Sequence, residues 1–229
     1  MKARLRKAFD RWRRNRTIHR LIREERQHLH ESFPEIAELM ASLPTVMDEY
    51  RDVHDEYTSS VSDPRNAISL ETAALLALCV RKFPLRRIMD TGSGFSSYLL
   101  RRECENKQET EHWSIEDDTH WLRRTIGFLQ AHSLSSDNLL LWDEFQLRAQ
   151  LRNFDLIFHD MGSMRSRVAS LPEIETRLSE SGMLVLDDMH KPSFREAAHL
   201  QLQSRFKLQS LVGLTLDLHG RFAYIARRK

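Results

Sequence analysis

The chain has 229 residues and a formal net charge of +2, from 35 Lys and Arg against 33 Asp and Glu. Its length suits one domain with an appendage, and 41% hydrophobic residues give it a globular composition. It has no apolar run of the ~18 residues that a transmembrane helix needs and no visible signal peptide, and its two cysteines exclude a disulfide framework. We therefore expect a cytoplasmic protein.

Residues 1–60 show helical spacing of apolar residues and punctuation by Pro34 and Pro44. The predicted elements are helices over 3–31, 35–42 and 45–57, followed by a linker over 58–64. We therefore divide the chain into a helical extension or lid, residues 1–60, and a main domain, residues 61–229.

The basic charge is concentrated in residues 1–26, which hold 11 Lys and Arg against three acids, a net of +8. The other 203 residues carry −6. Three interpretations stay open for this arm: packing on the domain as part of a lid, peripheral membrane contact through an amphipathic helix, and nucleic-acid contact. The acidic body makes nucleic acid the least favoured partner.

From residue 69 onward, apolar strand patterns alternate with helical patterns. The predicted strands cover residues 87–90, 112–116, 138–142, 154–159 and 183–186, with helices over 70–83, 96–104, 120–132, 167–179 and 193–205. Two last strands, 206–216 and 221–227, form a hairpin joined at 217–220. This alternation predicts an α/β fold, a mostly parallel sheet with helices on both faces.

A glycine-containing turn follows the first strand, in the sequence Asp90-Thr91-Gly92-Ser93-Gly94. The chain has only seven glycines and none before Gly92. A strand, a glycine turn and a helix in this order are typical of nucleotide-like ligand sites, although an ordinary tight turn is the simpler interpretation. Because Asp90 is a carboxylate, the turn favours a cationic or neutral ligand over a pyrophosphate.

Glu116 ends the second strand, 26 residues after Asp90. A carboxylate at this position can accept both hydroxyls of a ribose. The alternative is a solvated acid, since Asp117 and Asp118 follow directly.

Three carboxylates end the fourth and fifth strands: Asp160, Asp187 and Asp188. Parallel strands lie ~4.8 Å apart, so these groups converge at one edge of the sheet. There they must be protonated, separated by cations, or bound to a hard metal such as Mg²⁺. As a possible base we favour His190 over His159, because His159 alternates with Asp160 along the strand.

Four segments together resemble the class I S-adenosylmethionine (SAM)-dependent methyltransferases, in their small-molecule O-methyltransferase-like branch. These segments are 88–97, 113–122, 154–163 and 181–190. The resemblance implies a Rossmann-like seven-stranded sheet with the order 3-2-1-4-5-7-6. By analogy, Gly92 and Gly94 match the motif glycines, Ser96 stands at a third glycine position, Asp90 holds the methionine amino group, Glu116 holds the ribose and Asp143 lies beside the adenine.

The resemblance also implies roles at the acceptor end. Metal-dependent members place carboxylates at the positions of Asp160, Asp187 and Asp188, which makes these three the candidate ligands of Mg²⁺ or another divalent cation. The candidate catalytic residues are Asp160, Asp188 and His190. Asp160 is also a candidate cofactor contact. The basic residue that the family places soon after the strand-four acid is not Lys here.

We therefore predict methyl transfer from SAM to an oxygen, in preference to a nitrogen, of a small-molecule acceptor. The alternatives are a SAM-binding or partner-binding module without turnover, docked through its basic helix, and a nicotinamide-dependent oxidoreductase. An oligomer is possible.

Overall fold

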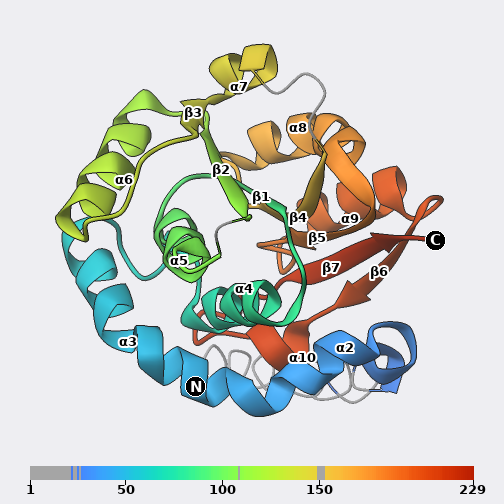
Figure 1. Ribbon diagram of the computed structural model, residues 1–229. Coiled ribbons are helices and arrows are strands. Elements are labelled where there is room, and N and C mark those ends of the chain that lie inside the picture. Colours follow the sequence, from blue (N-terminus) through green and yellow to red (C-terminus); the bar gives the residue numbers. More distant parts are fainter. Residues whose placement is uncertain (1–21, 23–24, 26, 108, 149–152) are drawn as a thin grey trace, which may run out of the picture.

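The computed structural model describes residues 22, 25, 27–107, 109–148 and 153–229 (Figure 1). The basic arm therefore lies almost wholly outside the described residues, and so do most of the predicted helix 3–31 and the proposed membrane contact. Residues 27–32 are helical, as predicted for the end of that helix. Within the described part, no helix is long and apolar enough to cross a membrane.

Seven strands form one sheet with the order β3-β2-β1-β4-β5-β7-β6, which confirms the predicted topology. Strands β1 to β5 pair in parallel, and β7 runs antiparallel to β5 and β6. The strands are β1 (Arg87–Thr91), β2 (Glu111–Glu116), β3 (Leu139–Leu141), β4 (Phe154–His159), β5 (Leu178–Leu186), β6 (Phe206–Ser210) and β7 (Tyr224–Arg228).

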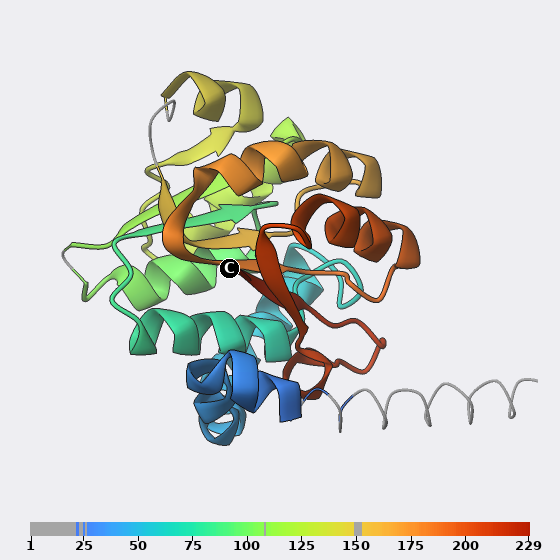
Figure 2. The same ribbon diagram turned by 90° about the vertical axis from the view of Figure 1, so that its right-hand side faces the viewer.

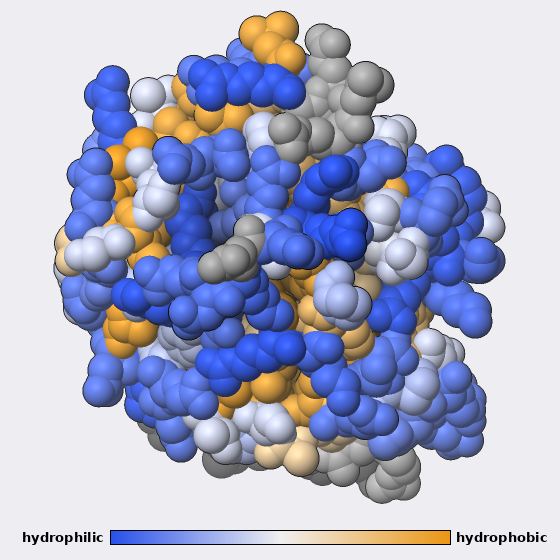
Figure 3. Space-filling view, viewed as in Figure 1, coloured by the Kyte–Doolittle hydropathy of each residue, from blue (hydrophilic) through white to orange (hydrophobic). Residues whose placement is uncertain are grey.

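Helices cover both faces of the sheet, with α8 and α9 on one face and α4 on the other (Figure 2). The longer helices are α3 (Leu43–Ser60), α4 (Leu70–Lys82), α5 (Phe95–Cys104), α6 (Thr119–Ala131), α7 (Trp142–Arg148), α8 (Met164–Arg177) and α9 (Pro192–Leu202). Short helices are α2 (Pro34–Ala37), η1 (Glu38–Ser42) and α10 (Val212–Thr215). Seen as in Figure 1, hydrophilic residues cover most of the surface (Figure 3).

The helices of residues 34–60 belong to the same hydrophobic core as α4. Ile36, Val46 and Tyr57 are buried, and the Tyr57 ring lies 5.6 Å from the Phe95 ring and 4.9 Å from the Phe128 ring between centroids. This part of the extension therefore packs on the domain. The division at residue 60 stays a prediction.

The predicted linker over 58–64 is wrong at its start, because α3 continues to Ser60. The hydroxyls of Ser59 and Ser60 both donate to the Glu56 carbonyl oxygen, at 3.0 and 2.7 Å. Hydroxyls that bond back to a carbonyl three or four residues earlier are compatible with a helix, so a serine-rich composition did not end it here.

The predicted closing hairpin is also wrong in detail. Strand β6 ends at Ser210, and α10 comes before the turn at residues 217–220 and strand β7. Leu211, Val212 and Leu214 are all buried, a spacing that fits a helical turn better than an alternating strand. The side chain of Thr215 donates to the Leu211 carbonyl oxygen (2.8 Å), which reinforces that turn.

His159 is the last residue of β4, and its burial can be tested by a titration of stability against pH. Its ring is fully buried, with Nε2 donating to the Arg167 carbonyl oxygen (2.9 Å) and Nδ1 accepting from the Thr91 hydroxyl (2.7 Å). Burial lowers the pKa of His159 from 6.5 to about 4.

Between these two pH values the unfolded chain binds a proton at His159 and the folded chain does not. The free energy of unfolding should therefore fall by about 3 kcal/mol as the pH falls from 6.5 toward 4. Denaturant unfolding across this range measures it. His159→Gln, which keeps a donor and an acceptor, should flatten the slope, and an equal slope in the variant would contradict the assignment.

Candidate functional site

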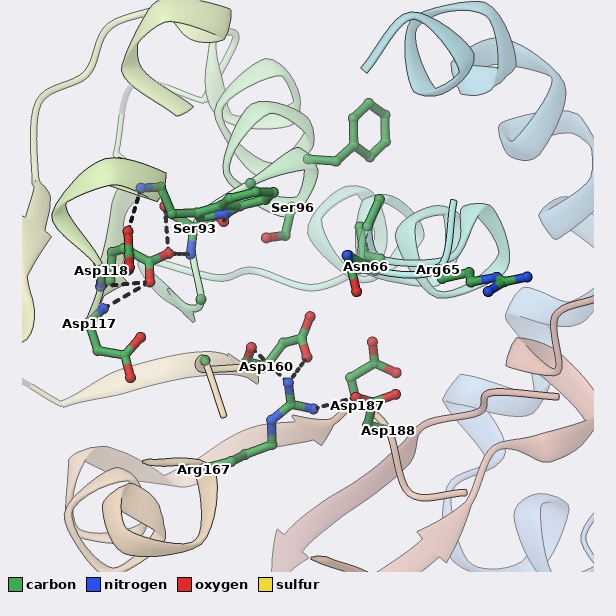
Figure 4. Close-up of a pocket in the computed structure, with 18 of the residues that line it drawn as sticks. Arg65, Asn66, Ser93, Ser96, Asp117, Asp118, Asp160, Arg167, Asp187 and Asp188 are labelled. Carbon is green, nitrogen blue, oxygen red and sulfur yellow. Dashed lines mark hydrogen bonds and ion pairs between the residues drawn. The ribbon is translucent and has the colours of Figure 1, made fainter. Parts of the chain in front are cut away.

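A cavity of about 440 Å³ opens at the carboxyl ends of β1, β2, β4 and β5 (Figure 4). Its wall includes the glycine turn after β1, Glu116 after β2, and the acids after β4 and β5. Asn66 and Ala67, which precede α4, lie on the same wall. A cavity of this size at this edge of an α/β sheet suits a small-molecule ligand.

Gly92 is the point where the turn after β1 approaches the end of β4. Its φ is +89°, and a Cβ atom there would overlap the Asp160 carbonyl oxygen and lie 2.7 Å from the Asp160 carbonyl carbon. The Gly92 N–H donates to the Ile115 carbonyl oxygen (2.8 Å), which ties the turn to β2 as well. Any residue with a side chain is therefore both strained and obstructed at this position.

Glu116 is held across the cavity floor by the glycine turn. Oε2 accepts from the backbone N–H and the hydroxyl of Ser93 at 2.8 and 2.9 Å, and Oε1 accepts from the N–H groups of Asp117 and Asp118 at 2.9 and 3.1 Å. The side chain is almost fully buried, and this burial raises the pKa of Glu116. The carboxyl is thus fixed on the cavity wall with a donor at each of its four lone-pair sites, so a ligand hydroxyl would take the place of one of these donors, such as the Ser93 hydroxyl.

Asp90 is not among the residues that line the cavity, and its expected contact with a ligand stays a prediction. The residue has no exposed surface. Four side chains donate to its oxygens: Ser96 (2.9 Å), Ser97 (2.7 Å), His112 (2.7 Å) and Ser114 (2.6 Å). Asp90 therefore holds the start of α5 against β2 from behind the turn, whereas Ser96 does lie on the cavity wall.

The three acids after β4 and β5 all lie on the cavity wall, and a cation separates two of them. The Arg167 guanidinium lies 2.5 Å from Asp160 Oδ1 and 3.1 Å from Asp188 Oδ2 (Figure 4). The Lys191 ammonium adds a second ion pair with Asp188 Oδ2 at 2.5 Å. Of the three arrangements open to these carboxylates, Asp160 and Asp188 have the one in which a cation separates them.

Asp187 is the acid of this group with no ion pair among the described residues. Burial, reinforced by the neighbouring Asp188, raises the pKa of Asp187. Across the described part of the chain, no three His, Cys, Asp or Glu side chains are placed to hold a metal ion. The predicted metal ligands Asp160 and Asp188 each direct one carboxylate oxygen, Oδ1 and Oδ2 respectively, at Arg167, so these residues do not fit the divalent cation that the resemblance implied.

Two further predicted site residues lie away from this cavity. His190 is not among the residues that line the cavity. Its Nδ1 lies 3.3 Å from Asp188 Oδ1, whereas the ion pairs of Asp188 with Arg167 and Lys191 use Oδ2. Asp143 lies in the first turn of α7 and lines a neighbouring cavity of about 530 Å³. Glu116 and Asp117 border both cavities, so Asp143 lies beyond the predicted ribose acid.

Sequence reasoning missed two arginines that shape the cavity. Arg167 follows Asp160 by seven residues, on a helix where a cation suggests only a solvated face. Arg221 donates to the carbonyl oxygens of Pro64, Arg65 and Ala67 at 3.0, 2.7 and 2.8 Å, and it pairs with Asp217. It therefore holds the segment before α4 against the cavity across more than 150 residues of sequence, a contact that no local pattern could reveal.

No family model matches this chain, and no curated protein matches its sequence. Solved structures do match its fold. An O-methyltransferase of Bacillus cereus in complex with SAH matches at 15% identity over 91% of this chain and 98% of its own, with a TM-score of 0.60. An O-methyltransferase of Streptomyces achromogenes involved in tomaymycin synthesis, in complex with SAM, matches at 16% identity over 82% and 89%, with a TM-score of 0.56. An SAH-bound methyltransferase of Podospora anserina matches at 15% identity over 80% and 88%, with a TM-score of 0.58. The chain therefore has the class I methyltransferase fold seen in these O-methyltransferase structures.

Proposed function

We propose that this protein is a SAM-dependent methyltransferase that acts on an oxygen of a small-molecule acceptor. The observation that carries the proposal is the pairing of Glu116 with Ser93 across the glycine turn, at the wall of a cavity of ligand size. This pairing places a buried carboxyl beside the start of α5, where a ribose and an amino acid group could both be held.

The charge of the cavity wall supports a cationic ligand. Six Asp and Glu side chains and four Lys and Arg side chains line the cavity, so its acids outnumber its permanent cations. A sulfonium group is attracted by such a wall, whereas the pyrophosphate of a nicotinamide cofactor is repelled. This electrostatic argument favours SAM over NAD.

SAM supplies a methyl group on a positively charged sulfur, and the residues of this chain would hold its parts. Glu116 would accept the ribose hydroxyls, and Asp143, beyond it, would lie toward the adenine. Gly92 and Gly94 would let the backbone approach the ligand, with Ser96 beside them, and Asp90 would support the turn from behind.

At the acceptor end, Asp160, Asp187 and Asp188 would face the reacting oxygen. Asp160 and Asp188 are engaged by Arg167, so we assign them a positioning role. The Asp187 carboxyl has no ion pair among the described residues, so we assign it the role of taking the acceptor's proton. His190 is not among the residues that line the cavity and is not assigned this role. Proximity and orientation inside the cavity would supply much of the rate enhancement.

Calorimetric titration with S-adenosylhomocysteine (SAH) and with NAD tests the cofactor. We expect saturable binding of SAH at one site and none of NAD, and binding of NAD alone would contradict the proposal. Transfer of a labelled methyl group from SAM, screened over hydroxylated small molecules, then separates an enzyme from a binding module. Binding of SAH with no product over the whole screen would favour the module.

Gly92→Ala should weaken SAH binding by about tenfold or more, because strain of about 1–3 kcal/mol and the clash with Asp160 would displace the turn. Isothermal titration of the folded variant measures the loss. Gly127→Ala in α6 is the matched control, since an added Cβ there meets nothing within 4 Å and alanine favours a helix. Equal losses in both variants would contradict the role of Gly92.

Glu116→Gln should weaken SAH binding by about 10- to 100-fold. The new amide keeps one acceptor oxygen where the carboxyl has two, and its NH₂ would face N–H donors that now point at the carboxyl, so a ribose hydroxyl would lose an acceptor worth about 1–3 kcal/mol. The same titration measures the loss, with exposed Glu105→Gln as control. Unchanged affinity in Glu116→Gln would remove Glu116 from the cofactor site.

A further inference from the structure

Arg167 enters the acceptor end of the cavity from the first turns of α8. Its guanidinium carbon lies 5.7 Å from the centre of the Phe194 ring, and its side chain is only 5% exposed. The helix start is fixed by Ser163, whose hydroxyl accepts from the Ser166 N–H at 3.1 Å. Arg167 is therefore a buried part of the fold, in contrast to a surface arginine that could swing away.

The backbone of the β4 end holds this guanidinium independently of the acids. Nε donates to the Met161 carbonyl oxygen at 3.2 Å, and Nη2 donates to the Asp160 carbonyl oxygen at 3.0 Å. The two ion pairs, to Asp160 Oδ1 and Asp188 Oδ2, use the remaining directions of the same planar group. Because backbone oxygens fix the guanidinium, its position does not depend on a ligand being present.

Arg167 engages Asp160 Oδ1 and Asp188 Oδ2, one oxygen from each of the two acids that a divalent cation at this edge would bridge. Mg²⁺ and Ca²⁺ bind carboxylate oxygens at about 2.0–2.6 Å, which leaves no room for a guanidinium on the same oxygens. Arg167 and Lys191 also offset two of the three carboxylate charges of Asp160, Asp187 and Asp188, which weakens the attraction of the cluster for a divalent cation. The free carboxyl of Asp187 alone is too few ligands for such an ion.

We propose that Arg167 is the permanent cation of the acceptor end, so that this protein works without a divalent metal and its acid cluster binds one only when Arg167 is removed. The consequence for catalysis rests on the proposed methyltransferase function, whereas the absence of a metal site rests on the ion pairs alone. In this arrangement the chain itself neutralises Asp160 and Asp188, and the acceptor is positioned between fixed charges.

Titration with Mn²⁺, followed by the electron paramagnetic resonance signal of the free ion, tests the proposal without any acceptor. We expect no saturable binding to the wild-type protein up to about 1 mM, the weak end of protein sites for such cations. Arg167→Met keeps the packing of the stem on Phe194 and removes the charge, and it should gain a Mn²⁺ site. That site should disappear again in the double variant Arg167→Met/Asp187→Asn.

Arg165→Met is the matched control, because Arg165 lies on the same helix and is exposed. It removes one positive charge away from the cluster and should gain no site. Saturable Mn²⁺ binding to the wild-type protein that is lost in Asp187→Asn would overturn the proposal, and so would Arg167→Met that folds, by circular dichroism, yet binds no Mn²⁺. SAH binding measured on the same samples reports separately on the proposed function: failure to bind SAH would refute the function and leave the metal result standing.

Discussion

The site depends on one close approach, between the backbone of Gly92 and the carbonyl group of Asp160. At this point the turn after β1 passes over the end of β4 with no room for a side chain. The Asp160 N–H donates to the Thr91 carbonyl oxygen (2.8 Å), so the two strand ends are also joined by a ladder bond. The same Asp160 carbonyl oxygen accepts from Arg167. The glycine turn, the end of β4 and the Arg167 guanidinium are therefore held in fixed positions relative to one another.

Behind the glycine turn lies a buried polar network centred on Asp90. Asp90 accepts four hydrogen bonds from side chains of α5 and β2, and Arg101 donates to the Ser114 hydroxyl (2.6 Å) and lies 3.1 Å from His112 Nδ1. A buried carboxylate is tolerated only when its oxygens are satisfied, and here they are. The network holds the N-terminal end of α5 in register with β1 and β2, which is what keeps the turn open toward the cavity.

The extension contributes to the site through α3. Tyr57 lies on the cavity wall, and its hydroxyl oxygen is 2.9 Å from where a Cβ on Gly94 would be. His54 on the same helix is hydrogen-bonded to the Ile68 carbonyl oxygen at 2.9 Å, which joins α3 to the segment before α4. The described part of the extension thus forms one wall of the cavity, and the lid interpretation of residues 1–60 stays a prediction.

Local pattern predicted the alternation of strands and helices, the position of the glycine turn and the place of Glu116 at a strand end, because strand periodicity, glycine scarcity and strand-end acids are properties of neighbouring residues. The order of the strands came from the resemblance of four segments to the class I methyltransferases. Only the tertiary structure decided that Asp90 faces inward, that residues 212–215 are helical, and that Arg167 lies between Asp160 and Asp188. Each of these depends on which distant groups compete for the same oxygen or the same buried space. A guanidinium and a metal ion are equally compatible with three converging carboxylates in sequence, and only the fold shows that Arg167 of α8 lies over the Phe194 ring beside two of them.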